Sequence, residues 1–177
     1  ANVIIDVDPV TTAVTVKDIT DASNIQDARV LIKAATGGLM PFNKSTTISR
    51  SGATATATAT THGLVTNDYV VIVGANQTEY NGVFQVTVTG TDTFTYTVTG
   101  TPAPPATGTI TTTGAPLYGT TNASGFLSAT RSFGSDQPIT GVVRKATTGT
   151  KYRTGVITGT IDNVTGFSVT VNLVRDE

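Results

Sequence analysis

Apolar and polar residues alternate with a period of two along most of the chain. The alternation is clearest in the segments 13–19, 54–60, 83–88, 94–98 and 167–174. A period of two places successive side chains on opposite faces of a strand, whereas a helix needs a period of 3.6. Gly, Pro and Asn separate these segments about every 8–12 residues, which is typical of β-sandwiches and β-barrels. The pattern therefore predicts an all-β fold without a helix longer than a turn or two.

Four other segments have a different pattern. Residues 28–34, ARVLIKA, are compatible with a helix face or a strand, and their β-branched residues with the Thr-Gly-Gly that follows favour a strand. Residues 3–7 and 69–73 are short apolar runs. Residues 100–107, GTPAPPAT, contain three prolines, which cannot lie in a central strand. We therefore expect a connector or a sheet edge there.

Hydroxyl side chains replace charged ones in this sequence. Threonine accounts for 39 of the 177 residues, and 13% of residues are charged, against about 25% in an average soluble domain. Because threonine is β-branched, this composition favours strands. The net charge of −1 argues against nucleic acid or an anionic membrane as a partner, since both select basic surfaces. The composition predicts a structural or binding protein.

The chain contains no cysteine, which suggests either assembly in a reducing cytosol or a prokaryotic surface protein that manages without disulfides. Its first residues, ANVIIDVDPV, lack the basic start of a signal peptide. No apolar run reaches the roughly 18 residues of a membrane span. We therefore expect a soluble protein.

The most specific stretch is HGLVTNDYVVIVGANQTEYNGVFQVTVTGTDTFTYTV, residues 62–98. Gly63 and Gly74 occupy positions where a turn requires a positive φ or a close backbone approach. Asn81-Gly82 suits a two-residue hairpin turn, and Phe84, Phe94 and Tyr96 are candidates for a small core. The stretch resembles a β-module of phage structural proteins, similar to the half-domain beside the catalytic cysteine region of ubiquitin-activating enzymes. The resemblance covers about 46–113 and implies a small β-barrel module without chemistry, because no catalytic cysteine or adenylation site is present.

The flanking segments resemble a second kind of domain. Residues 21–30, DASNIQDARV, and 120–126, TTNASGF, are similar to turns and strands of transthyretin-like or carboxypeptidase-regulatory-like sandwiches. Together the two resemblances predict an Ig-like (transthyretin-like) β-sandwich made of residues 1–45 plus 114–177. Residues 46–113 would be a β-module inserted into it. The whole arrangement resembles phage virion proteins of the capsid or the tail.

Two groups of polar residues are candidates for chemistry. His62 with Asp68 and a nearby hydroxyl would have the composition of a catalytic triad, but no G-x-S-x-G elbow is present, and a hydrogen-bonding role in a turn is favoured. Asp6, Asp8, Asp18 and Asp21 are candidate Ca²⁺ ligands or solvated carboxylates. No D-x-[DN]-x-[DN]-G loop accompanies them, which favours solvated carboxylates.

Aromatic residues and asparagines offer two further alternatives. Tyr69, Tyr80, Tyr96, Phe84 and Phe94 would suit either a sugar-stacking platform or a hydrophobic core, and the core is favoured. Four segments match the glycosylation sequon, beginning at Asn43, Asn76, Asn122 and Asn163. In a chain so rich in threonine such matches arise by chance.

The sequence therefore predicts a protein that is not an enzyme and has no catalytic, cofactor-binding or metal-binding residue. We expect a bacteriophage virion structural protein, either a capsid decoration protein or a tail or neck component. Its partners would be other virion proteins and copies of itself, with no nucleic acid and no membrane. The alternative is a carbohydrate- or cell-binding adhesin module of a phage fibre or a bacterial surface, with a host-surface glycan as its partner.

Overall fold

The computed structural model describes residues 8–147 and 149–176. The described chain contains the strands β1 to β15 and one 3₁₀ turn, η1 (Thr78–Tyr80), so the all-β prediction is confirmed. None of its helical segments is long and apolar enough to cross a membrane. The chain divides into two compact units, Ala1–Leu39 with Pro116–Glu177, and Met40–Ala115. The apolar run 3–7 and Asp6 lie outside the described residues.

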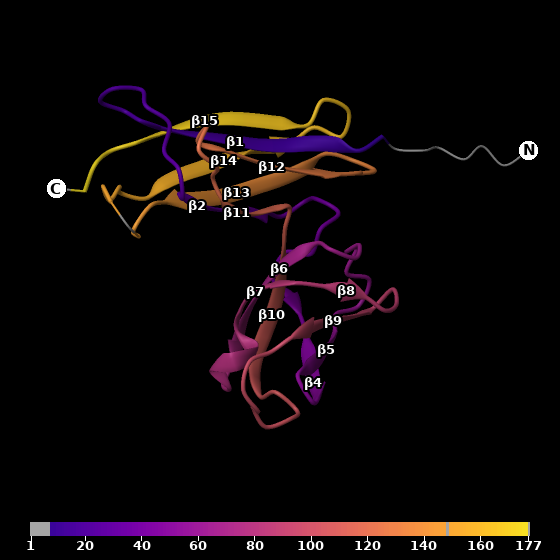
Figure 1. The fold of residues 1–177 in the computed structure, drawn as a ribbon. Helices are drawn as coiled ribbons and strands as arrows, with labels where there is room; N and C mark the ends of the chain where they lie inside the picture. Colours follow the sequence, from indigo (N-terminus) through magenta and orange to yellow (C-terminus); the bar gives the residue numbers. More distant parts are fainter. Residues whose placement is uncertain (1–7, 148, 177) are drawn as a thin grey trace, which may run out of the picture. The chain divides into compact units, whose positions relative to one another are not determined.

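The first unit is a sandwich of two sheets, which Figure 1 shows as two layers of strands. One sheet has the order β12-β1-β15 and the other β11-β2-β13-β14. The strands are β1 (Val10–Asp18), β2 (Arg29–Ala34), β11 (Leu117–Thr120), β12 (Phe126–Arg131), β13 (Gln137–Arg144), β14 (Gly155–Ile161) and β15 (Phe167–Leu173). The β-sandwich prediction is confirmed, and its finer transthyretin-like assignment stays a prediction.

Alternation fixes which side chains fill the sandwich. On β1 the buried residues include Val14 and Val16, and on β2 they are Val30, Ile32 and Ala34. β1 runs parallel to β15, whereas all other strand pairs of this unit are antiparallel. Because a slip of one residue would turn these apolar side chains to solvent, the buried face fixes the register.

The second unit contains two four-stranded sheets of the orders β3-β10-β6-β7 and β4-β5-β9-β8. The strands are β3 (Lys44–Ser45), β4 (Thr47–Ser51), β5 (Thr54–Thr58), β6 (Tyr69–Ala75), β7 (Gly82–Gln85), β8 (Thr87–Val88), β9 (Thr93–Thr97) and β10 (Gly108–Ala115). The pairing of the described strands closes no ring, so the expected barrel is not found. Each sheet keeps two edge strands, because β7 and β8 pair into different sheets.

Two local predictions for this unit are wrong. Residues 83–88 do not form one strand, because buried Val86 lies between β7 and β8 and donates its N–H to the Asp68 carbonyl. Asn81-Gly82 is not a two-residue turn either. The loop between β6 and β7 includes η1, and the Asn81 side chain bonds both the N–H and the carbonyl of Ala75. The Asn81 side chain thus holds the two ends of this longer loop together.

The alanines of β5 form a thin but fully buried face. Ala55 and Ala57 are buried and lie opposite Tyr96 and Phe94 of β9. The two aromatic rings supply the volume that the alanines lack, because cross-strand partners on one face are in contact. The core role predicted for Phe94 and Tyr96 is confirmed.

Two glycines of the second unit have the backbone that the sequence predicts. Gly63 has a φ of 64° and Gly74 a φ of 90°. A Cβ on Gly74 would meet the carbonyl of Thr109 on the neighbouring strand β10. A side chain at Gly74 is therefore excluded by the close approach of two strands as well as by φ.

The two units are joined at one end of an antiparallel strand pair. Leu117 of β11 lies opposite Ile32 of β2, so the second unit occupies the place of a hairpin loop between these strands. The division falls at 39/40 and 115/116, not at the expected 45/46 and 113/114. Lys44 and Ser45 belong to the second unit because they pair with β10.

We expect the first unit to fold without the second. Replacing residues 40–115 by a short Gly/Ser loop leaves β2 and β11 joined as an ordinary hairpin and leaves both sandwich sheets complete. Circular dichroism and a thermal melt should give a β-rich spectrum and a cooperative transition. A disordered product, with the intact chain as control, would show that the sandwich depends on the inserted unit.

Candidate functional site

His62 lies in the core of the second unit. It is 1% exposed, and its Nδ1 accepts the Leu64 N–H at 3.0 Å. Its ring meets Phe94 edge-on, with the centroids 5.3 Å apart. Since Nδ1 is the acceptor, the ring proton is on Nε2, which has no hydrogen-bond partner among the described residues. The hydrogen-bonding role predicted for His62 in a turn is confirmed.

The structure does not join His62 and Asp68 into a catalytic pair. Asp68 Oδ2 accepts the N–H of Val65 at 2.9 Å. In a triad the Nδ1 of His62 would donate to a carboxylate, but here Nδ1 accepts the N–H of Leu64. The two side chains bond the backbone of the same turn from its two ends. This arrangement holds the segment that leads into β6.

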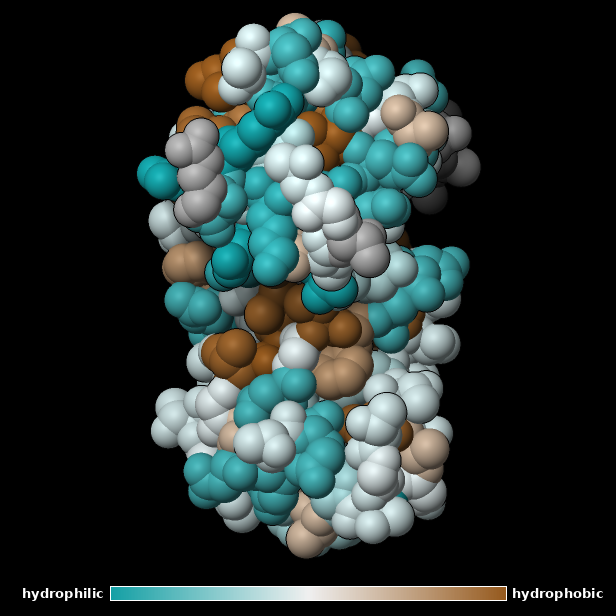
Figure 2. Space-filling view, turned by 60° about the vertical axis from the view of Figure 1, so that its left-hand side comes forward, coloured by the Kyte–Doolittle hydropathy of each residue, from teal (hydrophilic) through white to brown (hydrophobic). Residues whose placement is uncertain are grey.

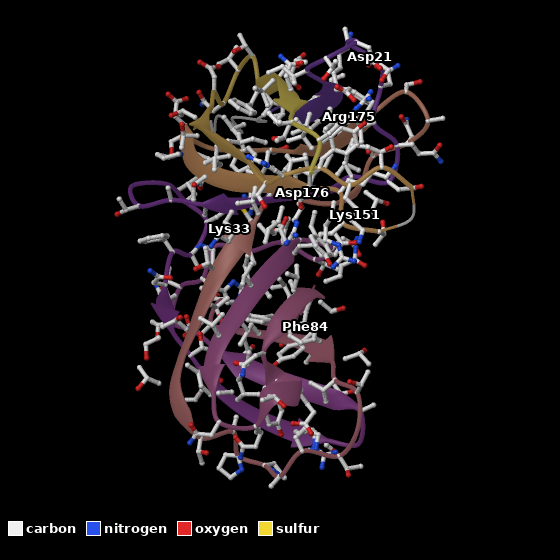
Figure 3. All side chains as sticks on the ribbon, turned by 90° about the vertical axis from the view of Figure 1, so that its left-hand side faces the viewer. Asp21, Lys33, Phe84, Lys151, Arg175 and Asp176 are labelled. Atoms are coloured by element: carbon white, nitrogen blue, oxygen red, sulfur yellow. The ribbon has the colours of Figure 1, made fainter. Side chains whose placement is uncertain are left out.

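The aspartates form a different site from the one expected. Asp18, at the end of β1, is 0% exposed, so its interpretation as a solvated carboxylate is wrong. Its Oδ2 accepts Arg175 Nε at 2.6 Å and the Tyr152 hydroxyl at 2.9 Å. Arg175 also donates to Asp21 at 2.9 Å, and Figure 3 shows these two labelled side chains near one another. The described residues contain no group of three or more possible metal ligands.

The hydrogen bonds and burial of this cluster shift the pKa values of Asp18 and Tyr152 in opposite directions. The Thr20 N–H, followed by Arg175 and Tyr152, lowers the pKa of Asp18 from 3.8 to about 2 against the opposing effect of burial. Burial, together with the bond to the Asp18 carboxylate, raises the pKa of Tyr152. The anion of Asp18 is thus the form that the fold stabilises.

The cluster ties the last described residues to the sandwich. Tyr152 pairs with Arg175 as an isolated bridge, and the Arg153 and Asp176 N–H groups donate to the carbonyls of Val174 and Lys151. Buried ion pairs are found where geometry and additional hydrogen bonds compensate for lost hydration. Asp18 therefore acts as a structural anchor.

Most of the predicted aromatic platform is buried. Tyr80, Phe94 and Tyr96 are core residues, and burial raises the pKa of Tyr96 strongly. Phe84 is half-buried, and its ring lies 4.4 Å from that of Tyr96, measured between centroids. Figure 3 labels Phe84 in the second unit. These rings are not arranged as an open stacking surface for a sugar.

The sequon asparagines lie in turns or loops. Asn122 Oδ1 accepts the N–H groups of Ser124 and Phe126, and Asn76 Nδ2 donates to Thr107. The side-chain Oδ1 of Asn43 accepts the Thr113 hydroxyl, and the Asn163 N–H donates to Asp136. Their structural roles are those of ordinary turn residues.

One cavity in the first unit was not predicted from the sequence. It has a volume of about 300 Å³ and is lined by Asp27, Arg29, Thr120, Arg144, Ala146 and Thr147. The strands β11, β2 and β13 bring Thr120, Arg29 and Arg144 into one cross-strand row. These residues are far apart in the sequence and match no motif, so only the strand register identifies them.

Comparisons with solved structures include a distant likeness. No family model and no curated protein matches the chain. A solved structure of the phage phi92 endosialidase matches with a TM-score of 0.36 and 18% identity, over 81% of this chain and 24% of that one. The chain thus spans about a quarter of that structure. A likeness at this score is too distant to assign a family or an activity.

We predict that the Asp18 cluster makes stability depend on acid pH. Because the native-state pKa of Asp18 lies below 3.8, its contribution is fully present above 3.8 and is lost as the pH falls toward about 2. Asp18→Asn should lower the melting temperature at neutral pH, and the difference from the wild type should shrink across that acid window. Asp176→Asn is the control, because Asp176 is exposed and 3.7 Å from Arg153. A constant difference at all pH values would contradict the prediction.

We also predict that His62 contributes to the stability of the second unit. His62→Ala removes one buried hydrogen bond, at about 0.5–1.5 kcal/mol, together with the packing against Phe94. Gly63→Val should cost roughly 1–2 kcal/mol because Gly63 has a left-handed backbone. Since Gly63 is exposed and His62 is buried, the His62 variant should melt at least as early. Unchanged melting of His62→Ala would show that the buried ring is dispensable.

Proposed function

We propose that this chain is a bacteriophage virion structural protein, a capsid decoration protein or a tail or neck component, that acts by protein–protein association. The low charge, the absence of cysteine and the resemblance of residues 46–113 to a phage β-module support the proposal. The structural observation that carries it is an exposed apolar pair beside a sheet edge.

The apolar pair is Val142 of β13 and Val156 of β14. They lie directly opposite each other in the register and are 44% and 70% exposed. The row continues through Leu31 and Tyr118, which are half-buried, so it crosses all four strands of the sheet. A continuous apolar row on a sheet face is typical of a surface that another protein covers.

The edge beside this pair is poorly protected. Among the described strands β14 pairs only with β13, and its sequence, GVITGTI, contains no charge and no proline. Isolated sheets commonly protect an edge with lysine or proline. Figure 2 shows that hydrophilic and neutral residues cover most of one face of the molecule and that hydrophobic residues gather in limited patches. The row and the edge favour association through this sheet.

We predict that Val156→Lys weakens self-association or binding to virions while leaving the fold intact. Covering a largely exposed valine contributes about 1–2 kcal/mol, so the association constant should fall about tenfold. Analytical ultracentrifugation and co-sedimentation with purified virions measure this. Val164→Lys is the matched control, because Val164 is 77% exposed but lies in the turn after β14.

Two results would contradict the proposal. One is a wild-type chain that stays monomeric at high micromolar concentration and does not sediment with virions. The other is the absence of the protein from purified particles of the phage whose genome encodes it. Equal association of the Val156→Lys and wild-type chains would instead exclude this row as the interface.

A further inference from the structure

The cavity of the first unit has the residues of an anion-binding site. Its two arginines, Arg29 and Arg144, are direct cross-strand partners on β2 and β13. Like charges in that position destabilise a sheet. No ion pair joins either guanidinium to a carboxylate in the described part of the chain. A bound anion would remove the repulsion, and guanidinium groups bind carboxylates through paired hydrogen bonds.

The rest of the cavity wall offers hydrogen-bond acceptors. Asp27 lines it and has a left-handed backbone, with a φ of 59°. The hydroxyls of Thr120 and Thr147 can donate or accept. A ligand that carries one anionic group and several hydroxyls would therefore satisfy both the arginines and the aspartate.

Buried contacts hold this wall in place. Thr121 is 1% exposed, and its hydroxyl accepts the Ala28 N–H and donates to the Ile25 carbonyl. Its own carbonyl accepts the Asp27 N–H. The loop that carries Asp27 into β2 is thus fixed to the end of β11. A preformed wall reduces the entropy that binding costs.

A second part of the wall is tied to the Asp18 cluster. Ala146 and Thr147 follow β13, and the carbonyl of the preceding residue, Lys145, accepts the Tyr152 N–H at 2.8 Å. Tyr152 is itself bonded to buried Asp18. Both segments that line the cavity are therefore tied to buried residues.

We propose that this cavity binds a sugar acid, a monosaccharide unit that bears a carboxylate. The carboxylate would lie between Arg29 and Arg144, and the sugar hydroxyls would donate to Asp27. A volume of about 300 Å³ is at the lower end of the range for small-molecule sites and suits one sugar ring. An inorganic anion fits less well, because it offers Asp27 few hydroxyl donors and fills less of the cavity. Arg29 and Arg144 lie two residues from Leu31 and Val142 on the same face of the sheet, so the site borders the valine row.

Isothermal titration of the full chain with galacturonate and galactose tests the proposal, because the two sugars differ only at the carboxylate position. Galacturonate should bind at millimolar or lower concentration and raise the melting temperature, whereas galactose should bind at least about tenfold more weakly. Arg29→Gln and Arg144→Gln should each weaken the binding of galacturonate about tenfold or more. Asp27→Asn should also weaken it.

Lys17→Gln provides the control, because it removes a positive charge from β1 in the other sheet and should leave binding unchanged. The arginine variants should melt no earlier than the wild type, since each removes a like-charge pair, so a loss of binding would not reflect unfolding. Equal affinity for both sugars, or no galacturonate binding at millimolar concentration, would overturn the proposal. Inorganic phosphate or acetate that binds as tightly as galacturonate would overturn it too. These outcomes concern sugar binding by the free chain, whereas the association of the chain is tested separately by Val156→Lys.

Discussion

The antiparallel pairing of β2 with β11 is the contact on which the chain organisation depends. It brings together two segments that are separated by the whole second unit, with Ile32 opposite Leu117. The entropy of closing such a loop grows only slowly with its length, so a folded unit can replace a short turn there. The same pairing sets Thr120 beside Arg29 and so builds half of the arginine cavity.

Much of the fold follows from local sequence, because the alternation of apolar and polar residues indicates which side chains of a strand are buried. Residues 13–19 and 28–34 form strands where the pattern predicts them, and the proline-rich segment 100–107 contains no strand before Gly108. The wrong predictions concern features that depend on long-range contacts. The division of 83–88 between two sheets depends on Val86 bonding to Asp68, which no local pattern encodes.

The candidate sites were less predictable than the fold. Asp18 and Asp21 were recognisable as carboxylates near one another, but Arg175, which neutralises them, is more than 150 residues away in the sequence. The arginines of the cavity become neighbours only through strand register. By contrast, the role of His62 could be predicted, because its partner Leu64 lies two residues away. Contacts within a turn can be predicted from the sequence, whereas contacts that depend on the pairing of distant strands cannot.

The parallel pairing of β1 with β15 has a mechanical consequence. The register runs from Thr12 opposite Phe167 to Asp18 opposite Leu173, and the evenly spaced ladder of a parallel pair is slanted along the strands. Tension between the start of β1 and the end of β15 would load these bonds in shear, all at once rather than one after another. The inserted unit takes no part in that ladder, because both of its connections leave from β2 and β11 of the other sheet. The sandwich could thus carry a pulling load while the second unit stays unstretched.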